Sequence, residues 1–282
     1  MILANARLPE GRLADVEIAD GLIVATHAPG TAAASNETID LDGLLLLPAF
    51  VDGHLHLDKT HWDAPRLPHV EGRSVRERIA AERIQRHQVA LPIEARASAL
   101  VRTLIMNGAT RARSHVDIDN DVGLDNLEAV IRVREAFRDW IDIQLVAFPQ
   151  SGVTSETGAP DLMAAALMAG VTDEGSPMLV RAEAAYSLGK IRPTPLGVAD
   201  FLLERITLGT APAIVTSTLA ALLQLDPPVD DQLVAWTTRA AALDAVCREV
   251  DRQAEAQVET REAPRARKYL EALIARWRAT SS

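Results

Sequence analysis

Hydrophobic and polar residues alternate at the start of the chain and later change to a helical spacing. Residues 14–25 alternate on both sides of Asp20-Gly21, a dipeptide typical of a two-residue hairpin turn, and therefore predict two antiparallel strands. Residues 38–43 predict a further short strand and turn. Together these segments predict a small antiparallel sheet within residues 1–49.

A continuous apolar run over residues 44–51 follows and ends at Asp52-Gly53. Its length is typical of a strand that is buried on both faces. From Ser74 the spacing becomes helical, and Ser74 to Glu77 fits a capping box. The next elements are predicted as a helix over 93–107, a strand over 109–118, a helix over 124–138, a strand over 141–148 and a helix over 161–169. This alternation indicates crossover units around a parallel sheet within residues 50–170.

Residues 171–282 are predicted to be mainly helical. Helices are predicted over 196–205, 232–258 and 265–278, the last with an apolar stripe of Tyr269, Leu270, Leu273, Ile274 and Trp277. Residues 179–188 fit a strand or a helix, and residues 211–216 predict one more strand. This part of the chain is either a shortened or rearranged region or an independently evolved helical one. A helical interaction module at 265–278 is a separate hypothesis for its role.

Composition narrows the class of protein. The net charge is −10, from 29 basic and 39 acidic residues, which argues against a general nucleic-acid binder. The longest apolar run is too short to span a bilayer, and the first residues lack the pattern of a signal peptide. The single cysteine, Cys247, excludes an internal disulfide and a thiolate zinc site. We therefore expect a cytoplasmic protein that acts on a small molecule without a nucleic-acid or membrane partner. A homo-oligomer is left open.

All seven histidines lie within the first 115 residues. His54 and His56 follow the apolar run, and residues at i and i+2 of a strand share one face. Two imidazoles on one face suit a divalent metal ion, although two surface histidines on a strand are an ordinary alternative. His61, His69 and His87 fall in a polar, arginine-rich segment and are expected at the surface.

Three motifs stand in order along the chain. They are His54 to Thr60, preceded by Pro48-x-Phe50-Val51-Asp52, then Arg113 to Asp119, and then Val146 to Gly152. Over about residues 1–170 the sequence resembles the amidohydrolase superfamily, in particular its cytosine deaminase and N-isopropylammelide hydrolase branch. Ala49 departs from the glycine usual in that family. The resemblance implies an α/β fold, namely an incomplete or shortened TIM-barrel-like (β/α) hydrolase with a small N-terminal sheet and a mainly helical C-terminal part.

The resemblance also implies roles for individual residues. His54 and His56 would bind a catalytic divalent metal, iron or zinc. Gln150 would read the amide edge of a pyrimidine-like ring, because a primary amide donates and accepts side by side. The alternative for Gln150 is a turn residue after Pro149.

Three further polar residues are expected near this site. His115 and Asp117 share a strand face and would support the metal ligands, or they form an ordinary buried polar pair. Asp58 either forms a buried ion pair with Lys59 beneath the site or, with Lys59, only ends the strand.

The activity that the resemblance implies is metal-dependent hydrolysis of a C–N bond in a pyrimidine or triazine-type ring. Cytosine or a related nitrogen heterocycle would be the substrate, and ammonia or an amine would be released. The family takes further histidines, a glutamate and an aspartate from later strands, but no histidine follows His115. A catalytically incomplete or truncated relative is therefore the alternative. Asp173, Glu174 and Glu183 either replace a missing ligand or are solvated loop acids, and no residue is assigned as the catalytic group.

Overall fold

The computed structural model describes residues 1–33, 37–68, 72, 74–153, 156–226, 239–256 and 262–280. The chain divides into two compact units. One consists of residues 1–51 with 108–110, and the other of residues 52–107 with 111–282.

The first unit contains a four-stranded sheet. Its strands are β1 (Ile2–Arg7), β2 (Leu13–Ala19), β3 (Leu22–His27) and β4 (Thr38–Asp40), in the order β3-β2-β1-β4. β2 and β3 pair antiparallel around Asp20-Gly21, where both residues have positive φ, so the predicted hairpin is confirmed. β4 pairs parallel with β1. The sheet is therefore mixed rather than antiparallel throughout, because the chain crosses from the β3 edge to the opposite edge before β4 begins.

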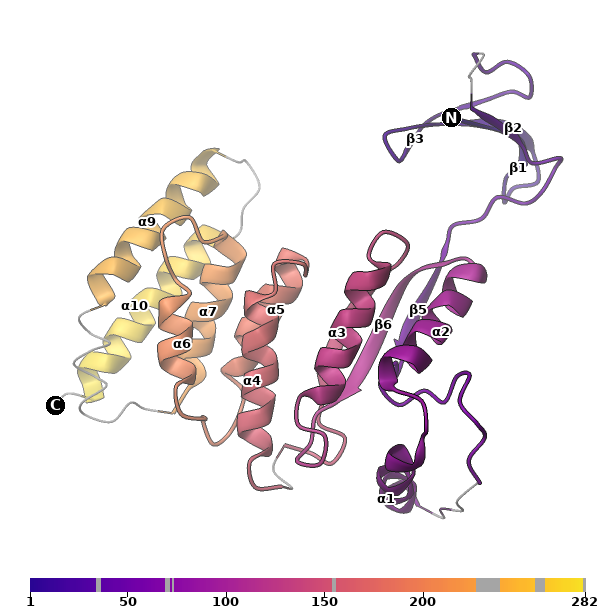
Figure 1. Ribbon diagram of the computed structural model, residues 1–282. Coiled ribbons are helices and arrows are strands. Elements are labelled where there is room, and N and C mark those ends of the chain that lie inside the picture. The colour runs from indigo at the N-terminus through magenta and orange to yellow at the C-terminus, as the bar shows by residue number, and fades with distance from the viewer. Residues whose placement is uncertain are drawn as a thin grey trace. The chain divides into compact units, whose positions relative to one another are not determined.

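A second sheet has the order β5-β6-β7, and its strands alternate with helices. Its strands are β5 (Phe50–Leu55), β6 (Ala109–Asp117) and β7 (Asp142–Phe148), and its helices are α1 (Val75–Gln85), the short 3₁₀ helix η1 (Arg86–Gln88), α2 (Ile93–Met106), α3 (Asp125–Phe137) and α4 (Ala159–Thr172). β6 and β7 pair parallel from Arg111 opposite Asp142 to Asp117 opposite Phe148. The α/β class is confirmed, and Figure 1 shows β6 between α2 and α3 in the view drawn.

Two local signals in this part of the sequence work as predicted. Ser74 accepts a hydrogen bond from the Glu77 amide, and the Glu77 side chain accepts one from the Ser74 amide, which completes the capping box of α1. α2 ends at Asn107, and Gly108 follows with a φ of 84°. Such a left-handed conformation suits glycine, which has no Cβ to clash.

The apolar run over residues 44–51 is not the buried strand that its composition predicts. β5 begins only at Phe50, and the side chains of Leu44, Leu45, Leu47, Phe50 and Val51 are 51–67% exposed. Apolar composition shows that a segment favours burial, but it does not specify which element will cover it. Leu57, seven residues after Phe50, is by contrast fully buried.

The described residues after α4 form helices. They are α5 (Met178–Leu188), α6 (Val198–Glu204), α7 (Pro212–Gln224), α9 (Ala240–Ala256) and α10 (Glu262–Thr280). α7 packs against both α5 and α10 (Figure 1). The strand predicted at 211–216 is therefore wrong. Pro212 begins the helix, where its missing N–H costs nothing, and tertiary packing overrides the β propensity of Ile214 and Val215, both of which are buried.

The expected stripe on α10 is partly confirmed, because Leu270, Leu273 and Trp277 are buried whereas Tyr269 and Ile274 are half-buried. The described residues form no closed barrel, since their parallel pairing in the second sheet is limited to a three-stranded arrangement. None of the described helices is long and apolar enough to cross a membrane.

Candidate functional site

Three imidazoles and one phenyl ring gather around β5, β6 and the end of β7. The His54 and His56 ring centroids lie 5.4 Å apart, as expected for nearby residues of one strand end. His115 of β6 stacks on His54 with centroids 4.2 Å apart and an interplanar angle of 23°. Phe148 lies edge-on to both His56 and His115, at 5.8 and 5.7 Å. The first two motifs and the end of β7 therefore meet at one place.

Burial makes His56 and His115 hard to protonate. Burial, with further contributions from the charges of Lys59, His115 and His54, lowers the pKa of His56 to about 4. Burial and then His54 also lower the pKa of His115. The Nδ1 atoms of His56 and His115 are buried and accept or donate no hydrogen bond within the described residues. A neutral imidazole with a free nitrogen is the form that binds a metal ion.

The described side chains meet the coordination requirements of a catalytic divalent metal ion only in part. A catalytic zinc ion ordinarily takes three protein ligands and keeps one open position. Among the described residues, no group of three His, Cys, Asp or Glu side chains has an arrangement that holds a metal ion. The donor set as described therefore falls short of a catalytic centre, and His54 and His56 as metal ligands remain a prediction.

A polar cluster centred on Lys59 lies near these histidines. The Lys59 ammonium is 3.3 Å from both carboxylate oxygens of Asp117 and 3.1 Å from Oε1 of Glu82 on α1. It also donates to Oε1 of Gln150, whose Nε2 donates to Oε2 of Glu82 at 3.3 Å. The Gln150 side chain therefore belongs to a polar network. Its backbone N–H also donates to the Phe148 carbonyl at 3.0 Å, so Gln150 is not only a turn residue.

Asp58 does not pair with Lys59, which was one of the two alternatives that the sequence left open. One oxygen of Asp58 accepts the Asp117 amide at 2.9 Å and the Asn126 side chain at 3.2 Å, whereas its Oδ1 has no partner within the described residues. Lys59, which follows the end of β5, pairs with Asp117 instead. Burial raises the pKa of Asp58. Burial and the nearby Asp58 charge raise the pKa of Asp117 to about 6, against the opposing effect of Lys59.

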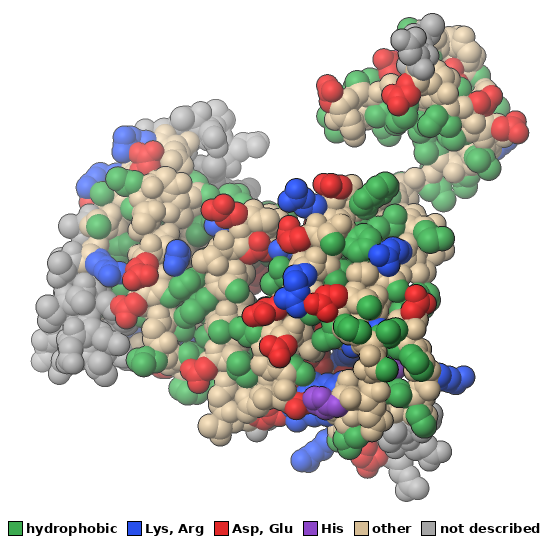
Figure 2. All heavy atoms as spheres, viewed as in Figure 1, with side chains coloured by type: hydrophobic (Ala, Val, Ile, Leu, Met, Phe, Trp, Pro, Cys, Tyr) green, Lys and Arg blue, Asp and Glu red, His purple; other side chains and the backbone are tan. Residues whose placement is uncertain are grey.

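Arg83 of α1 and Arg86 of η1 hold this helical segment at the carboxyl end of β6. Arg83 pairs with Asp119 at 3.3 Å and with Glu156. Arg86 makes two bonds of 3.1 Å to Asp119 and also binds Asp121. Burial alone would raise the pKa of Asp119, but bonds from Arg86 and from backbone amides hold it below its usual value. On the face drawn in Figure 2, acidic and basic side chains are interspersed.

The role of α1 could not be derived from the sequence. α1 has no fully buried residue, so its hydrophobic pattern gives little sign of how it is held. The sequence offered one signal: a strong capping box at the start of a helix that has almost no apolar stripe. Such a helix relies on its polar side chains for contacts with the rest of the protein.

The other polar residues singled out in the sequence lie outside this cluster. His61 is exposed, and the exposed His87 pairs with Asp121 at 2.7 Å, as expected for surface residues. His69 lies outside the described residues. Asp173 pairs with Arg134 at 2.8 Å, and Glu183 is exposed.

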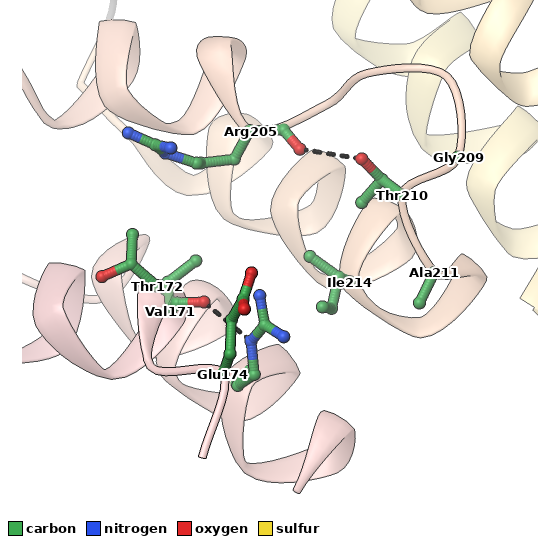
Figure 3. Close-up of a pocket in the computed structure, with 9 residues that line it drawn as sticks. Val171, Thr172, Glu174, Arg205, Gly209, Thr210, Ala211 and Ile214 are labelled. Carbon is green, nitrogen blue, oxygen red and sulfur yellow. Dashed lines mark hydrogen bonds between the residues drawn. The ribbon is translucent and has the colours of Figure 1, made fainter. Parts of the chain in front are cut away.

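Glu174 lines a separate pocket of about 360 Å³ between the ends of α4 and α5 and the loop that precedes α7 (Figure 3). Arg181 and Arg205 also line this pocket, and Arg181 Nε donates to the Val171 carbonyl at 2.9 Å. None of the histidines, nor Gln150, contributes to its walls. Glu174 therefore gives no support to a replacement metal ligand.

Comparison with known proteins adds three findings. The model of the Amidohydrolase family matches residues 37–218, which is more than half of the chain. N-isopropylammelide isopropyl amidohydrolase of Pseudomonas sp. (strain ADP) is 32% identical over 157 residues, covering 54% of this chain and 39% of that protein. Pterin deaminase of Rhizobium rhizogenes is 30% identical over 213 residues, covering 66% of this chain and 48% of that protein.

Among solved structures, N-isopropylammelide isopropylaminohydrolase from Burkholderia multivorans aligns with a TM-score of 0.55 and 28% identity. The alignment covers 86% of this chain and 66% of that chain. The aligned part of this chain spans less than half of the length of the curated relatives it matches.

Proposed function

Because the chain belongs to the amidohydrolase family, we propose that it hydrolyses an exocyclic C–N bond of a small nitrogen heterocycle. The ring would be of the pyrimidine or triazine type, with cytosine as the simplest case, and the product would be ammonia or an amine. The observation that carries this proposal is the meeting of His54, His56 and His115 with the Gln150 network at one end of the second sheet. The names of relatives that act on ammelide and pterin rings support the same class.

In this proposal each residue has a distinct task. His54 and His56 supply two ligands of a divalent ion, iron or zinc, such as members of the family generally use. Gln150 holds the ring through its amide, which offers a donor and an acceptor side by side. His115 and Phe148 form an apolar and aromatic wall beside the two ligands. Asp117 holds Lys59, and Asp58 holds the Asp117 backbone.

The direct test loads the purified chain with Zn²⁺ or Fe²⁺ and measures bound metal together with release of ammonia or isopropylamine. Cytosine, pterin and N-isopropylammelide are the substrates. We expect turnover of at least one ring. His54→Ala and His56→Ala should each abolish metal retention, because two ligands leave none to spare, whereas His87→Ala at the surface should retain it. Gln150→Ala should weaken ring binding with the metal content unchanged. A chain that stays inert on every ring after loading would refute the proposal.

The second candidate is a catalytically incomplete relative that binds the ring without turnover. It is favoured by one observation: among the described residues, no three His, Cys, Asp or Glu side chains are arranged to hold a metal ion. Calorimetry distinguishes the candidates, since ring binding of the loaded protein without any product release over hours supports the incomplete relative. Tightly held metal at one ion per chain together with turnover excludes it.

A further inference from the structure

The side-chain amide of Gln150 lies between a cation and an anion. Lys59 Nζ donates to Oε1, and Nε2 donates to Glu82 Oε2 at 3.3 Å. Lys59 and Glu82 themselves pair at 3.1 Å, so the three side chains form a closed ring of contacts. Turning the amide by 180° would place its NH₂ group against an ammonium and its oxygen against a carboxylate. The charges of the two neighbours therefore allow one orientation of the amide.

Both neighbours are held in place from outside this ring. Lys59 is fixed by the two oxygens of Asp117, and its side chain is only 17% exposed. Glu82 stands on α1, which is attached at the adjacent Arg83 to Asp119 and Glu156. The orientation of the Gln150 amide is therefore a property of the folded site and does not depend on a bound ligand.

We propose that Glu82 is a positioning residue that fixes the orientation of the Gln150 amide and so determines which order of donor and acceptor on a ring edge is accepted. This inference rests on the proposed function, because it assumes that Gln150 contacts the ring. Each end of the amide keeps one hydrogen-bonding position: a second N–H on Nε2 and a second lone pair on Oε1. A lactam edge, with a ring N–H beside a C=O, matches this pair, whereas an amidine edge, with a ring nitrogen acceptor beside an exocyclic NH₂ donor, presents the two groups in the reverse order.

The first measurement needs no substrate. In protein labelled with ¹⁵N-glutamine, the side-chain NH₂ signals of Gln150 are assigned by their loss in Gln150→Glu. We expect these protons to exchange with water about 10-fold more slowly than those of exposed glutamines, and Glu82→Gln to remove that protection. Glu82→Asp, which keeps the charge on a shorter side chain, should recover part of it. Glu94→Gln is the matched control, because Glu94 pairs with Arg132 and belongs to none of the contacts that hold Lys59, Glu82 or Gln150. Rapid exchange in the unmodified protein would overturn the inference.

The second measurement is ring selectivity, from calorimetric affinities for a lactam heterocycle and for its amino analogue, in which an amidine edge replaces the lactam edge. We expect the unmodified protein and Glu94→Gln to favour the lactam about 10-fold, and Glu82→Gln to lose that preference because its neutral amide accepts either orientation of Gln150. Unchanged selectivity in Glu82→Gln contradicts the inference. If neither ring binds while the Gln150 protons remain protected, the proposed function and the selectivity role fail together, and the fixed amide orientation stands.

Discussion

The Asp117 carboxyl provides a quantitative test of the electrostatics at the candidate site. It is 3% exposed, and burial together with Asp58 raises its pKa from 3.8 to about 6. A shift of about 2 units at about 1.4 kcal/mol per unit amounts to about 3 kcal/mol. Between these two pKa values the folded chain binds more protons than the unfolded chain. The Asp117 contribution to stability is therefore fully present below pH 3.8 and is lost as the pH rises through about 6.

The assay compares Asp117→Asn with the unmodified protein by urea unfolding at steps between pH 4 and pH 8. The difference in unfolding free energy, mutant minus unmodified, should rise by about 3 kcal/mol, most of it between pH 4 and pH 7. Taking the difference removes the titration of groups that both proteins share. Asp119→Asn is the matched control. The pKa of Asp119 is lowered rather than raised, so its difference should stay flat above pH 5.

Two results would refute this reasoning. A flat difference for Asp117→Asn would mean that the carboxyl is hydrated in the folded chain. A difference that falls with rising pH would mean that Lys59 outweighs burial and holds the carboxylate ionised.

Three further predictions concern other parts of the chain. Arg86→Ala should lower the unfolding free energy by about 3 kcal/mol, because it leaves the buried Asp119 carboxylate without its main partner; chemical denaturation measures this, and a loss below about 1 kcal/mol would show that α1 is held by other contacts. Leu273→Ala should cost about 3 kcal/mol by leaving a cavity under α10, where the side chain is fully buried; near-neutral stability would mean that the helix is loosely packed. Burial raises the pKa of Cys247 to about 11, so a thiol reagent should label it no faster than the chain unfolds; rapid labelling at pH 8 would contradict its burial.

Elements with a local cause could be predicted from the sequence. The hairpin at Asp20-Gly21 and the capping box at Ser74 each depend on a few adjacent residues, so the sequence carries the whole signal. The helix at 212–224 was not predicted, because the β-branched residues of its first turn resemble a strand and only packing against α5 and α10 decides the outcome.

The residues of the candidate site also divide into those with a local sequence signal and those without one. His54 and His56 were found from their spacing, because two residues of one strand end are neighbours in any fold that keeps the strand. Glu82 could not be found in this way, since its partners Lys59 and Gln150 are 23 and 68 residues away along the chain. The roles of His54, His56 and Gln150 toward a metal ion and a ring remain predictions.

The exposed apolar run before β5 has a consequence for the behaviour of the chain at high concentration. Leu44 to Leu47 and Phe50-Val51 are apolar, largely exposed and uncharged, a composition that favours pairing with a strand of another molecule. Pro48 stands between the two halves and offers no N–H to an incoming strand, so continuous pairing along the run is blocked. We therefore expect Pro48 to limit pairing with a second copy of the chain to the short stretches on either side of it.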